Sequence, residues 1–385
     1  MRASFLFLSF FSSSLQVHSW DISLILEREA SGAVGGEAFL VQPELSVSNK
    51  KKTNLYTNIE GQIRAKLVHA MVKEKLGVIS NGRCETDDSE NGISFPIKGG
   101  VTKFSDLCIN RSGDGYIIVF ELFDEFGILL GSTKQVNINV QKGNPYQIGV
   151  IQAPRVVFGG KAWLVSPIVA IQDRGRNKID NINDGNISIS LVGVSNGGRL
   201  SFPGIYDDEG NTQHNASPNT MRWSNGTAEF EGLSIDVAQE GYQLNFSTSI
   251  SLSGPSFCLS DPISVQAGEA EGLVEIEGPH MGPVYGGKVF VHQPVLHLVD
   301  AGGNIATNDN ASLVSISLYE HLSNASIFPI DKTVVTSEAG VVRFRNLFIN
   351  PSGNGYRFIY ELFSLMDDGS YIRTNITHLG KCMNF

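Results

Sequence analysis

The stretch Gly340-Val341-Val342-Arg343-Phe344-Arg345-Asn346-Leu347-Phe348-Ile349, followed by Gly355-Tyr356, decides the fold because the chain contains it three times. The other copies run from Gly100 to Ile109, with Gly115-Tyr116, and from Gly226 to Ile235, with Gly241-Tyr242. In each copy about twelve residues separate the phenylalanine (Phe104, Phe230, Phe344) from the tyrosine, which suits two short strands and a turn. Self-similarity of this kind indicates three copies of one structural repeat.

A second motif precedes the first in every copy. It is a glycine pair that leads into an apolar strand carrying a proline: Gly35-Gly36 to Pro43, Gly159-Gly160 to Pro167, and Gly286-Gly287 to Pro294. The second and third copies continue into Asp173…Asn177 and Asp300…Asn304, which we interpret as polar turns that end the strand. The first copy carries Ser48-Asn49-Lys50 at this place instead.

The residues between these motifs alternate in polarity. In Tyr242-Gln243-Leu244-Asn245-Phe246-Ser247 the apolar side chains share one face, and Asn186-Ile187-Ser188-Ile189-Ser190-Leu191 has the same period of two. A sheet with one apolar face needs a second sheet to cover it. We therefore predict an all-β fold of three tandem immunoglobulin-like antiparallel β-sandwiches in an elongated array. Tyr116, Tyr242 and Tyr356 are assigned to the fold, with each hydroxyl bonded to nearby backbone as in a tyrosine corner.

Length and composition agree with three domains. The chain has 385 residues, abundant glycine and a low charged fraction, which favours short strands and turns over helical bundles. The apolar run Phe5–Phe11 and the small residues that follow predict a signal peptide, cut before Trp20. The predicted boundaries are 1–19 for the signal peptide, 20–143 for the first repeat, 144–268 for the second and 269–385 for the third. No later window has the length and apolarity of a membrane span.

The order Gly-Gly-x-x-Phe/Trp…Pro…Asp-x-x-x-Asn, then Gly-Val-x-x-Phe-x-x-Leu-x-Ile…Gly-Tyr, resembles the Ig-like repeats of large extracellular and adhesin proteins, including the invasin/intimin type, and also filamin repeats. The resemblance covers nearly all of the mature chain. It implies a spacer, adhesion or ligand-binding ectodomain. The chain departs from antibody-type domains because it lacks their Cys…Trp…Cys pattern.

Secretion would allow disulfides and N-glycosylation. Cys84 and Cys108 lie in the same repeat and are candidates to pair, whereas Cys258 and Cys382 pair with each other, pair with segments outside this sequence, or stay free. The candidate glycosylation sites are the eight Asn-x-Ser/Thr sequons at Asn110, Asn186, Asn215, Asn225, Asn245, Asn310, Asn324 and Asn375. Among these, Asn186 and Asn245 fall on the predicted polar faces of strands.

Motifs with catalytic or metal-binding potential are weak. Gly193-Val194-Ser195-Asn196-Gly197 matches the nucleophile elbow of hydrolases, but no helical periodicity follows it, so we interpret it as a hairpin turn. The histidines His280, His292 and His297 lack zinc-site spacing. The acidic stretches Glu85–Glu90 and Asp207–Glu209 lack the spacing of a calcium loop and suit solvated loops, and Asp173 and Asp300 are explained by turn formation rather than calcium. We predict no catalytic residues, metal or cofactor.

The net charge of -10, with Lys50-Lys51-Lys52 as the only basic run, argues against nucleic acid or an anionic membrane as the partner. We predict a secreted or cell-surface, non-enzymatic protein that acts as a structural, adhesion or ligand-binding ectodomain for an unidentified protein or glycan. The alternatives are a glycan-binding secreted module, a secreted hydrolase with one degenerate repeat, and a cytoplasmic filamin-like spacer.

Overall fold

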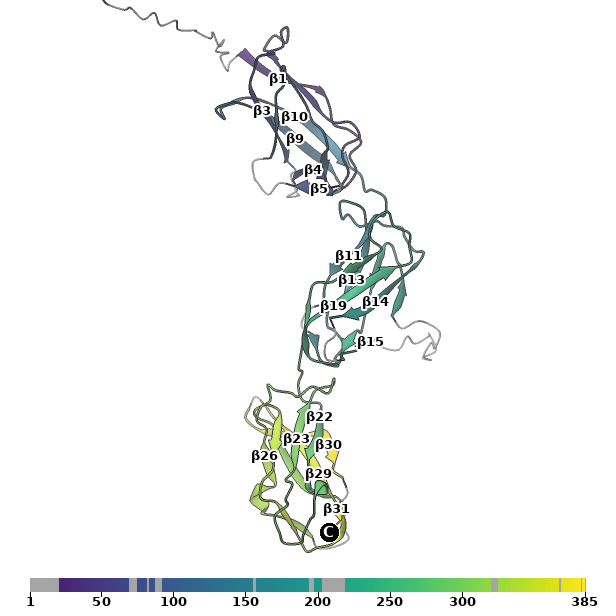
Figure 1. The fold of residues 1–385 in the computed structure, drawn as a ribbon, viewed down its shortest axis with the longest axis vertical. Helices are drawn as coiled ribbons and strands as arrows, with labels where there is room; N and C mark the ends of the chain where they lie inside the picture. The colour runs from purple at the N-terminus through teal and green to yellow at the C-terminus, as the bar shows by residue number, and fades with distance from the viewer. Residues whose placement is uncertain are drawn as a thin grey trace, which may run out of the picture. The chain divides into compact units, whose positions relative to one another are not determined.

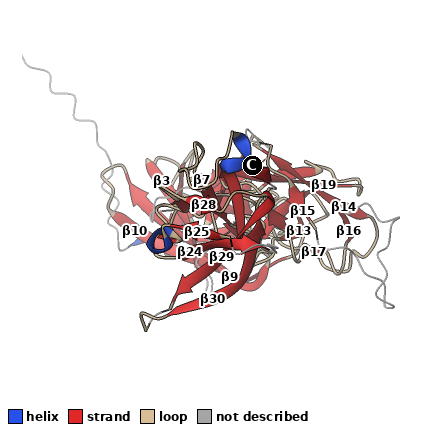
Figure 2. Ribbon diagram, turned by 90° about the horizontal axis from the view of Figure 1, so that it is seen from below, coloured by secondary structure: helices blue, strands red, loops and turns tan. Residues whose placement is uncertain are grey.

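A computed structural model describes residues 21–68, 75–81, 83–86, 92–154, 157–193, 197–202, 219–319, 325–366, 368–381 and 383–384. In this part of the chain the protein is all-β, and nearly all pairings are antiparallel. Two short 3-10 helices interrupt the strands, at Pro279–Met281 and Ile330–Lys332. Figure 1 labels the strands in chain order and Figure 2 colours them against the short helices. The predicted all-β class with antiparallel sheets is confirmed. The signal peptide at 1–19 lies outside the described residues.

The first repeat contains a three-stranded sheet of order β1-β2-β7, a four-stranded sheet of order β10-β9-β3-β6, and a small sheet of order β5-β4-β8. Its strands are β1 (Ile22–Arg28), β2 (Glu44–Asn49), β3 (Gly61–Val68), β4 (Leu76–Ser80), β5 (Arg83–Thr86), β6 (Ile93–Pro96), β7 (Val101–Lys103), β8 (Leu107–Ile109), β9 (Gly113–Asp124) and β10 (Leu129–Val140). The motif from Gly100 to Ile109 thus forms β7 and β8, and the spacing from Phe104 to Tyr116 covers β8 and the start of β9.

The second repeat repeats this plan. Its sheets have the orders β11-β13-β17, β12-β21-β19-β14-β16 with β20 also paired to β19, and β15-β18. Its strands are β11 (Gln147–Gln152), β12 (Val157–Phe158), β13 (Ile168–Gln172), β14 (Asn186–Val192), β15 (Leu200–Ser201), β16 (Thr220–Arg222), β17 (Thr227–Glu229), β18 (Ser234–Ile235), β19 (Gln239–Thr248), β20 (Phe257–Leu259) and β21 (Ile263–Gln266). The short pair β12 and β21 is parallel.

The third repeat follows the same plan again, with sheet orders β22-β23-β27, β26-β24-β29-β30 with β31 also paired to β29, and β25-β28. Its strands are β22 (Gly272–Glu277), β23 (Val295–Val299), β24 (Leu313–Tyr319), β25 (Ser326–Phe328), β26 (Val334–Thr336), β27 (Val341–Arg343), β28 (Phe348–Asn350), β29 (Asn354–Leu365), β30 (Tyr371–Leu379) and β31 (Met383–Asn384).

Compactness divides the chain differently from the sequence repeats. The first compact unit comprises residues 1–149, 171–182 and 252–255, and the second comprises 150–170, 183–251 and 256–385. The first unit therefore contains the turn that follows β13, which belongs by sequence to the second repeat. The predicted boundaries at 143 and 268 stay predictions.

Apolar side chains from two sheets meet in one core. In the first repeat Leu45 and Val47 of β2 pack in the same cluster as Ile63 of β3 and Phe120 of β9. In the third repeat the cluster joins β23 to β24 and β29 in the same way. The expected alternation is also present, because Tyr242, Leu244 and Phe246 are fully buried while the residues between them are half-buried. Two sheets that share a core in this manner form a β-sandwich.

The recurring tyrosines are structural, as predicted. Each hydroxyl donates to the carbonyl five residues upstream: Tyr116 to Arg111 at 3.0 Å, Tyr242 to Val237 at 3.1 Å, and Tyr356 to Pro351 at 3.3 Å. Each ring is buried. The bond fixes the loop that enters the long strand β9, β19 or β29. It therefore also positions the loop residues described in the next subsection.

A disulfide joins Cys84 of β5 to Cys108 of β8 across the central strand β4. Gly77 of β4 lies beneath it, since a Cβ there would be 2.7 Å from Cys84 Sγ. Among the described residues Cys258 is outside any disulfide, and burial raises the pKa of its thiol to about 11. It is therefore a protonated, weakly reactive thiol near neutral pH. Cys382 lies outside the described residues.

Asp309 provides a pH-dependent contribution to the third repeat. Burial opposes its charged form, but the hydroxyls of Ser312 and Ser337 and the amides of Ser312 and Ala311 donate to the carboxylate and lower its pKa. A lowered pKa in the folded state means that the stabilisation is present above the ordinary pKa and is lost as pH falls. We expect Asp309→Asn to lower the unfolding free energy at pH 7 by about 1 kcal/mol, since this group is partly exposed. In urea denaturation the difference from wild type should shrink as pH falls below the ordinary pKa of an aspartate and through the lowered pKa of Asp309. A difference that is constant with pH would contradict this role.

Candidate functional site: two backbone clasps and a basic cleft

The polar turn after β13 is bound by the first repeat. Asn177 Nδ2 donates to the carbonyl oxygen of Asn110 at 2.7 Å, and the backbone N–H of Ser112 donates to Asn177 Oδ1 at 2.9 Å. The N–H of Gly143 donates to Asp173 Oδ2, also at 2.9 Å. Asp173 is fully buried, and its carboxylate holds the side chain of Asn177 in place. We call this set of contacts the first clasp; all of its residues lie in the first unit.

An equivalent set forms at the turn after β23, within the second unit. Asn304 Nδ2 donates to the carbonyl oxygen of Asp236 at 2.6 Å, and the N–H of Ala238 donates to Asn304 Oδ1 at 2.8 Å. The N–H of Gly268 donates to Asp300 Oδ2 at 2.8 Å. This second clasp matches the first bond for bond. The turns predicted at Asp173…Asn177 and Asp300…Asn304 are confirmed. The clasp bonds also attach each turn to the preceding repeat.

The glycine pair of each preceding repeat forms the seat of the turn. A Cβ on Gly35 would lie 2.2 Å from Asn177 Nδ2, and one on Gly159 would lie 2.1 Å from Asn304 Nδ2. The second glycine of each pair has positive φ and lies against the backbone of the turn: a Cβ on Gly36 would be 2.3 Å from Gly175 N, and one on Gly160 equally far from Gly302 N. Distances under 3.0 Å leave no room for any side chain, so the motif Gly-Gly is required by the clasp.

No turn of another repeat lies against the third glycine pair among the described residues, although a Cβ on Gly286 would lie 2.7 Å from Ser352 Cβ. Gly286 and Gly287 are exposed, whereas Gly35, Gly36 and Gly159 are buried. Gly287 has φ +71 like Gly160, yet a Cβ on it would meet nothing within 4 Å. In the first repeat Asn49 and Thr53 occupy the turn positions of Asp and Asn, and Thr53 N donates to Asn49 Oδ1 at 2.9 Å. The turn geometry thus persists there without the carboxylate.

The clasp aspartates are not arranged as cation ligands. The carboxylate of Asp300 accepts from the backbone N–H groups of Gly268, Gly302 and Asn304, and Asp173 is surrounded similarly. Donated hydrogens point positive charge at the carboxylate oxygens, which leaves those lone pairs unavailable to calcium. No group of three or more His, Cys, Asp or Glu within the described ranges is placed to hold a metal ion.

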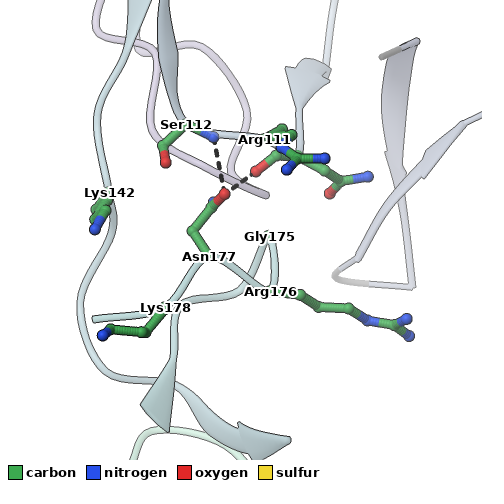
Figure 3. Close-up of a pocket in the computed structure, with 8 residues that line it drawn as sticks. Arg111, Ser112, Lys142, Gly175, Arg176, Asn177 and Lys178 are labelled. Carbon is green, nitrogen blue, oxygen red and sulfur yellow. Dashed lines mark hydrogen bonds between the residues drawn. The ribbon is translucent and has the colours of Figure 1, made fainter. Parts of the chain in front are cut away.

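A cleft of about 560 Å³ opens over the first clasp and is lined by cationic side chains. Its lining residues are Asn110, Arg111, Ser112, Lys142, Gly175, Arg176, Asn177 and Lys178. Figure 3 shows the two lysines on one side of Asn177 and the two arginines on the other. We call this the basic cleft. Its lining contains no carboxylate, imidazole or thiol.

The positive charge is specific to the first clasp. Superposing the two clasps residue by residue places Val237 at the position of Arg111, Ala267 at Lys142, Gly303 at Arg176 and Ile305 at Lys178. The clasp bonds are the same in both, so none of these four charges is needed to form one. Arg176 has φ +67, in the left-handed region that favours glycine, where the second clasp has Gly303 at φ +84. An arginine in this region has a strained backbone conformation, and the clasp bonds do not explain why arginine rather than glycine is present.

One carboxylate partly neutralises the basic cleft. Asp180 forms ion pairs with Lys142 and, at 3.2 Å, with Lys178. Hydrogen bonds from Lys142 and then Lys178 lower the pKa of Asp180 below its ordinary value. Arg111 and Arg176 make no ion pair with any residue in the described ranges, and both are exposed. The guanidinium groups are therefore available to an anionic ligand.

The cleft is not apparent from the sequence because its charges come from three separate segments around residues 111, 142 and 176–178. The basic run that is visible in the sequence, Lys50-Lys51-Lys52, lies on an exposed turn and is not among the residues that line the cleft. A signal was present in the aligned repeats, since each of the four cationic positions is uncharged in the other clasp.

The candidate glycosylation sites differ in exposure. Asn186, Asn225 and Asn310 are exposed, while Asn245 is half-buried in β19. Asn110 is half-buried in the first clasp, where its Nδ2 donates to the carbonyl of Cys84 at 3.2 Å. Asn375 lies on β30. The sequons at Asn215 and Asn324 lie outside the described residues.

The motifs that the sequence analysis set aside form no second site. His292 pairs with Glu277 at 2.9 Å, and His280 lies 3.9 Å from Glu275. The carboxylate of Glu275 in turn accepts a hydrogen bond from the hydroxyl of Tyr360. Burial and this carboxylate raise the pKa of Tyr360, so its phenol is a neutral structural donor. Ser195, the acidic residues 87–90 and Asp207–Glu209 lie outside the described residues.

No known protein family and no curated protein matches the sequence. Solved structures with similarity to the chain include an Escherichia coli adhesin, 14% identical over 93% of this chain and 98% of that chain, with a TM-score of 0.26. Extracellular cadherin domains 3–6 of protocadherin gamma B2 are 11% identical over 93% of this chain and 72% of that chain, with a TM-score of 0.25. A Parabacteroides merdae β-glucuronidase is 11% identical over 63% of this chain and 24% of that chain, with a TM-score of 0.20. At these TM-scores the similarities carry no functional inference.

Proposed function

We propose that the protein is a secreted or cell-surface, non-catalytic ectodomain in which three β-sandwich repeats form a scaffold that presents a ligand-binding surface. The observation that supports this most is the clasp, which occurs twice with the same bonds. Each clasp attaches the turn of one repeat to the loop, linker and glycine pair of the repeat before it. Each bond contributes about 1 kcal/mol, so the bonds of one clasp together hold the turn on the preceding repeat.

Two further features agree with this proposal. The Cys84–Cys108 disulfide is stable in an oxidising compartment, as outside the cell. The open cleft has a cationic lining suited to binding rather than to proton transfer. The structure contains no helix, within the described ranges, of sufficient length and apolarity to cross a membrane.

The proposal is tested by expressing the full chain in a secretory host and measuring its intact mass from the medium. We expect a chain that begins at Trp20 and is heavier by N-glycans removable with N-glycosidase. Cys84 and Cys108 should react with an alkylating reagent only after reduction of the disulfide. A full-length, unglycosylated chain retained inside the cell would overturn the proposal and favour an intracellular spacer.

A further inference from the structure

The basic cleft combines three properties that structure alone does not require. Its four cations are absent from the matching second clasp, two guanidinium groups are exposed and unpaired within the described ranges, and one arginine occupies a left-handed backbone position. The whole chain carries a net charge of -10, so this local concentration of positive charge runs against the overall balance.

We propose that the basic cleft binds an anionic glycan, a carbohydrate chain that carries several sulfate or carboxylate groups. An arginine guanidinium group can donate two hydrogen bonds to a pair of oxygens on a carboxylate or sulfate group, and lysine ammonium groups add charge. The inference rests on the proposed extracellular location for the choice of ligand, but not for the existence of the site.

The distribution of charge favours an extended ligand. The two lysines and the two arginines lie on opposite sides of Asn177 rather than around one point (Figure 3). A single small anion would contact one side, whereas a chain with repeated acidic groups crosses the cleft and contacts both. The cleft volume of about 560 Å³ is within the range of sites that hold small ligands and suits a short saccharide segment.

Other polyanions fit the cleft less well. Single-stranded nucleic acid is commonly held by stacking bases on aromatic rings, and the lining contains no aromatic residue. Binding to an anionic bilayer is usually reinforced by apolar side chains that insert beneath the headgroups, and the lining contains none of these either. The clasp uses the side-chain amide of Asn177, but the hydroxyl of Ser112 and the side-chain oxygen of Asn110 also line the cleft and can bond sugar hydroxyls.

The second clasp supplies a matched variant. A fourfold variant takes, at each cationic position, the residue that the chain itself uses at the second clasp, so the clasp bonds are retained. Its substitutions are Arg111→Val, Lys142→Ala, Arg176→Gly and Lys178→Ile. Binding of the full chain to immobilised heparin is then measured at about 0.15 M salt, with uncharged dextran as the blank. We expect the wild type to bind and the fourfold variant to lose about 10- to 100-fold in affinity, from four exposed charge contacts.

A second variant distinguishes binding from a structural role. Asp180→Asn removes the carboxylate that engages both lysines, and we expect heparin affinity to rise about threefold. Replacing Lys50, Lys51 and Lys52 with alanine is the control and should leave binding unchanged. Unaltered binding in the fourfold variant, or no binding by the wild type, would overturn the proposal.

The competing polyanions are tested with the same proteins. Single-stranded DNA and vesicles containing phosphatidylserine are presented in place of heparin. Equal or tighter binding to either, with the same loss in the fourfold variant, would overturn the assignment to a glycan. Because these assays use purified protein, they succeed or fail independently of whether the chain is secreted, so failure of this inference and failure of the proposed function give different results.

Discussion

Replacing Cys84 and Cys108 together with alanine is expected to lower the unfolding free energy of the first unit by about 3.5 kcal/mol. The two cysteines are 24 residues apart in sequence, and closing a loop of this length removes that amount of entropy from the unfolded chain. The bond crosses the central strand of the sheet β5-β4-β8, where Gly77 leaves room for the sulfurs. Phe348 takes the position of Cys108 in the third repeat and stacks on Phe328 instead.

The measurement is urea denaturation of the oxidised chain and the double variant, with hydrogen exchange of β4 and β8 to assign the loss to the first unit. Cys258→Ala is the control, because Cys258 is outside the disulfide and lies in another unit. A loss below about 1 kcal/mol in the double variant would contradict a stabilising role for the bond.

The second large effect is expected for Gly160→Ala. Any L-residue at this positive φ costs about 1 kcal/mol, and here the added Cβ would also lie 2.3 Å from Gly302 N and 2.4 Å from the carbonyl carbon of Ala301. Backbone atoms cannot rotate away, so the turn must leave its seat and the clasp bonds of Asn304 and Asp300 are lost. We expect a total cost of about 3–4 kcal/mol for the clasped state.

Gly287→Ala is the matched control because Gly287 has the same φ of +71 as Gly160 and no atom within 4 Å of an added Cβ. It should show the backbone cost of about 1 kcal/mol alone. Thermal unfolding and limited proteolysis between residues 266 and 272 are compared in the two variants. Equal effects in both would mean that backbone conformation, and not the seat of the turn, explains the glycine pair.

Local sequence patterns predicted the fold well. A period of two placed Tyr242, Leu244 and Phe246 inside, and the spacing from Phe104 to Tyr116 predicted two strands and a structural tyrosine. These features depend on residues near one another in the chain, so short-range patterns contain them. Whether each sequon is exposed or buried was harder to predict from the sequence. Asn245 was placed on a polar face, but it is half-buried because β20 also pairs with its strand.

The functional features depended on tertiary contacts that local patterns do not contain. Gly159-Gly160 was interpreted as leading into a strand, whereas its main role is to seat a turn about 140 residues later in the chain. The basic cleft likewise joins Arg111 to Arg176 and Lys178 across the first clasp. Net charge averaged over the whole chain concealed it, and alignment of the two clasps makes it visible.

Backbone hydrogen exchange at the four clasp donors tests the central structural claim most directly. Ser112 and Gly143 donate in the first clasp, and Ala238 and Gly268 in the second. We expect slow exchange at all four in the wild type, with Asn177→Ala accelerating only the first pair and Asn304→Ala only the second. Fast exchange at these amides in the wild type, or no change in the matching variant, would contradict the clasps as the restraint on successive repeats.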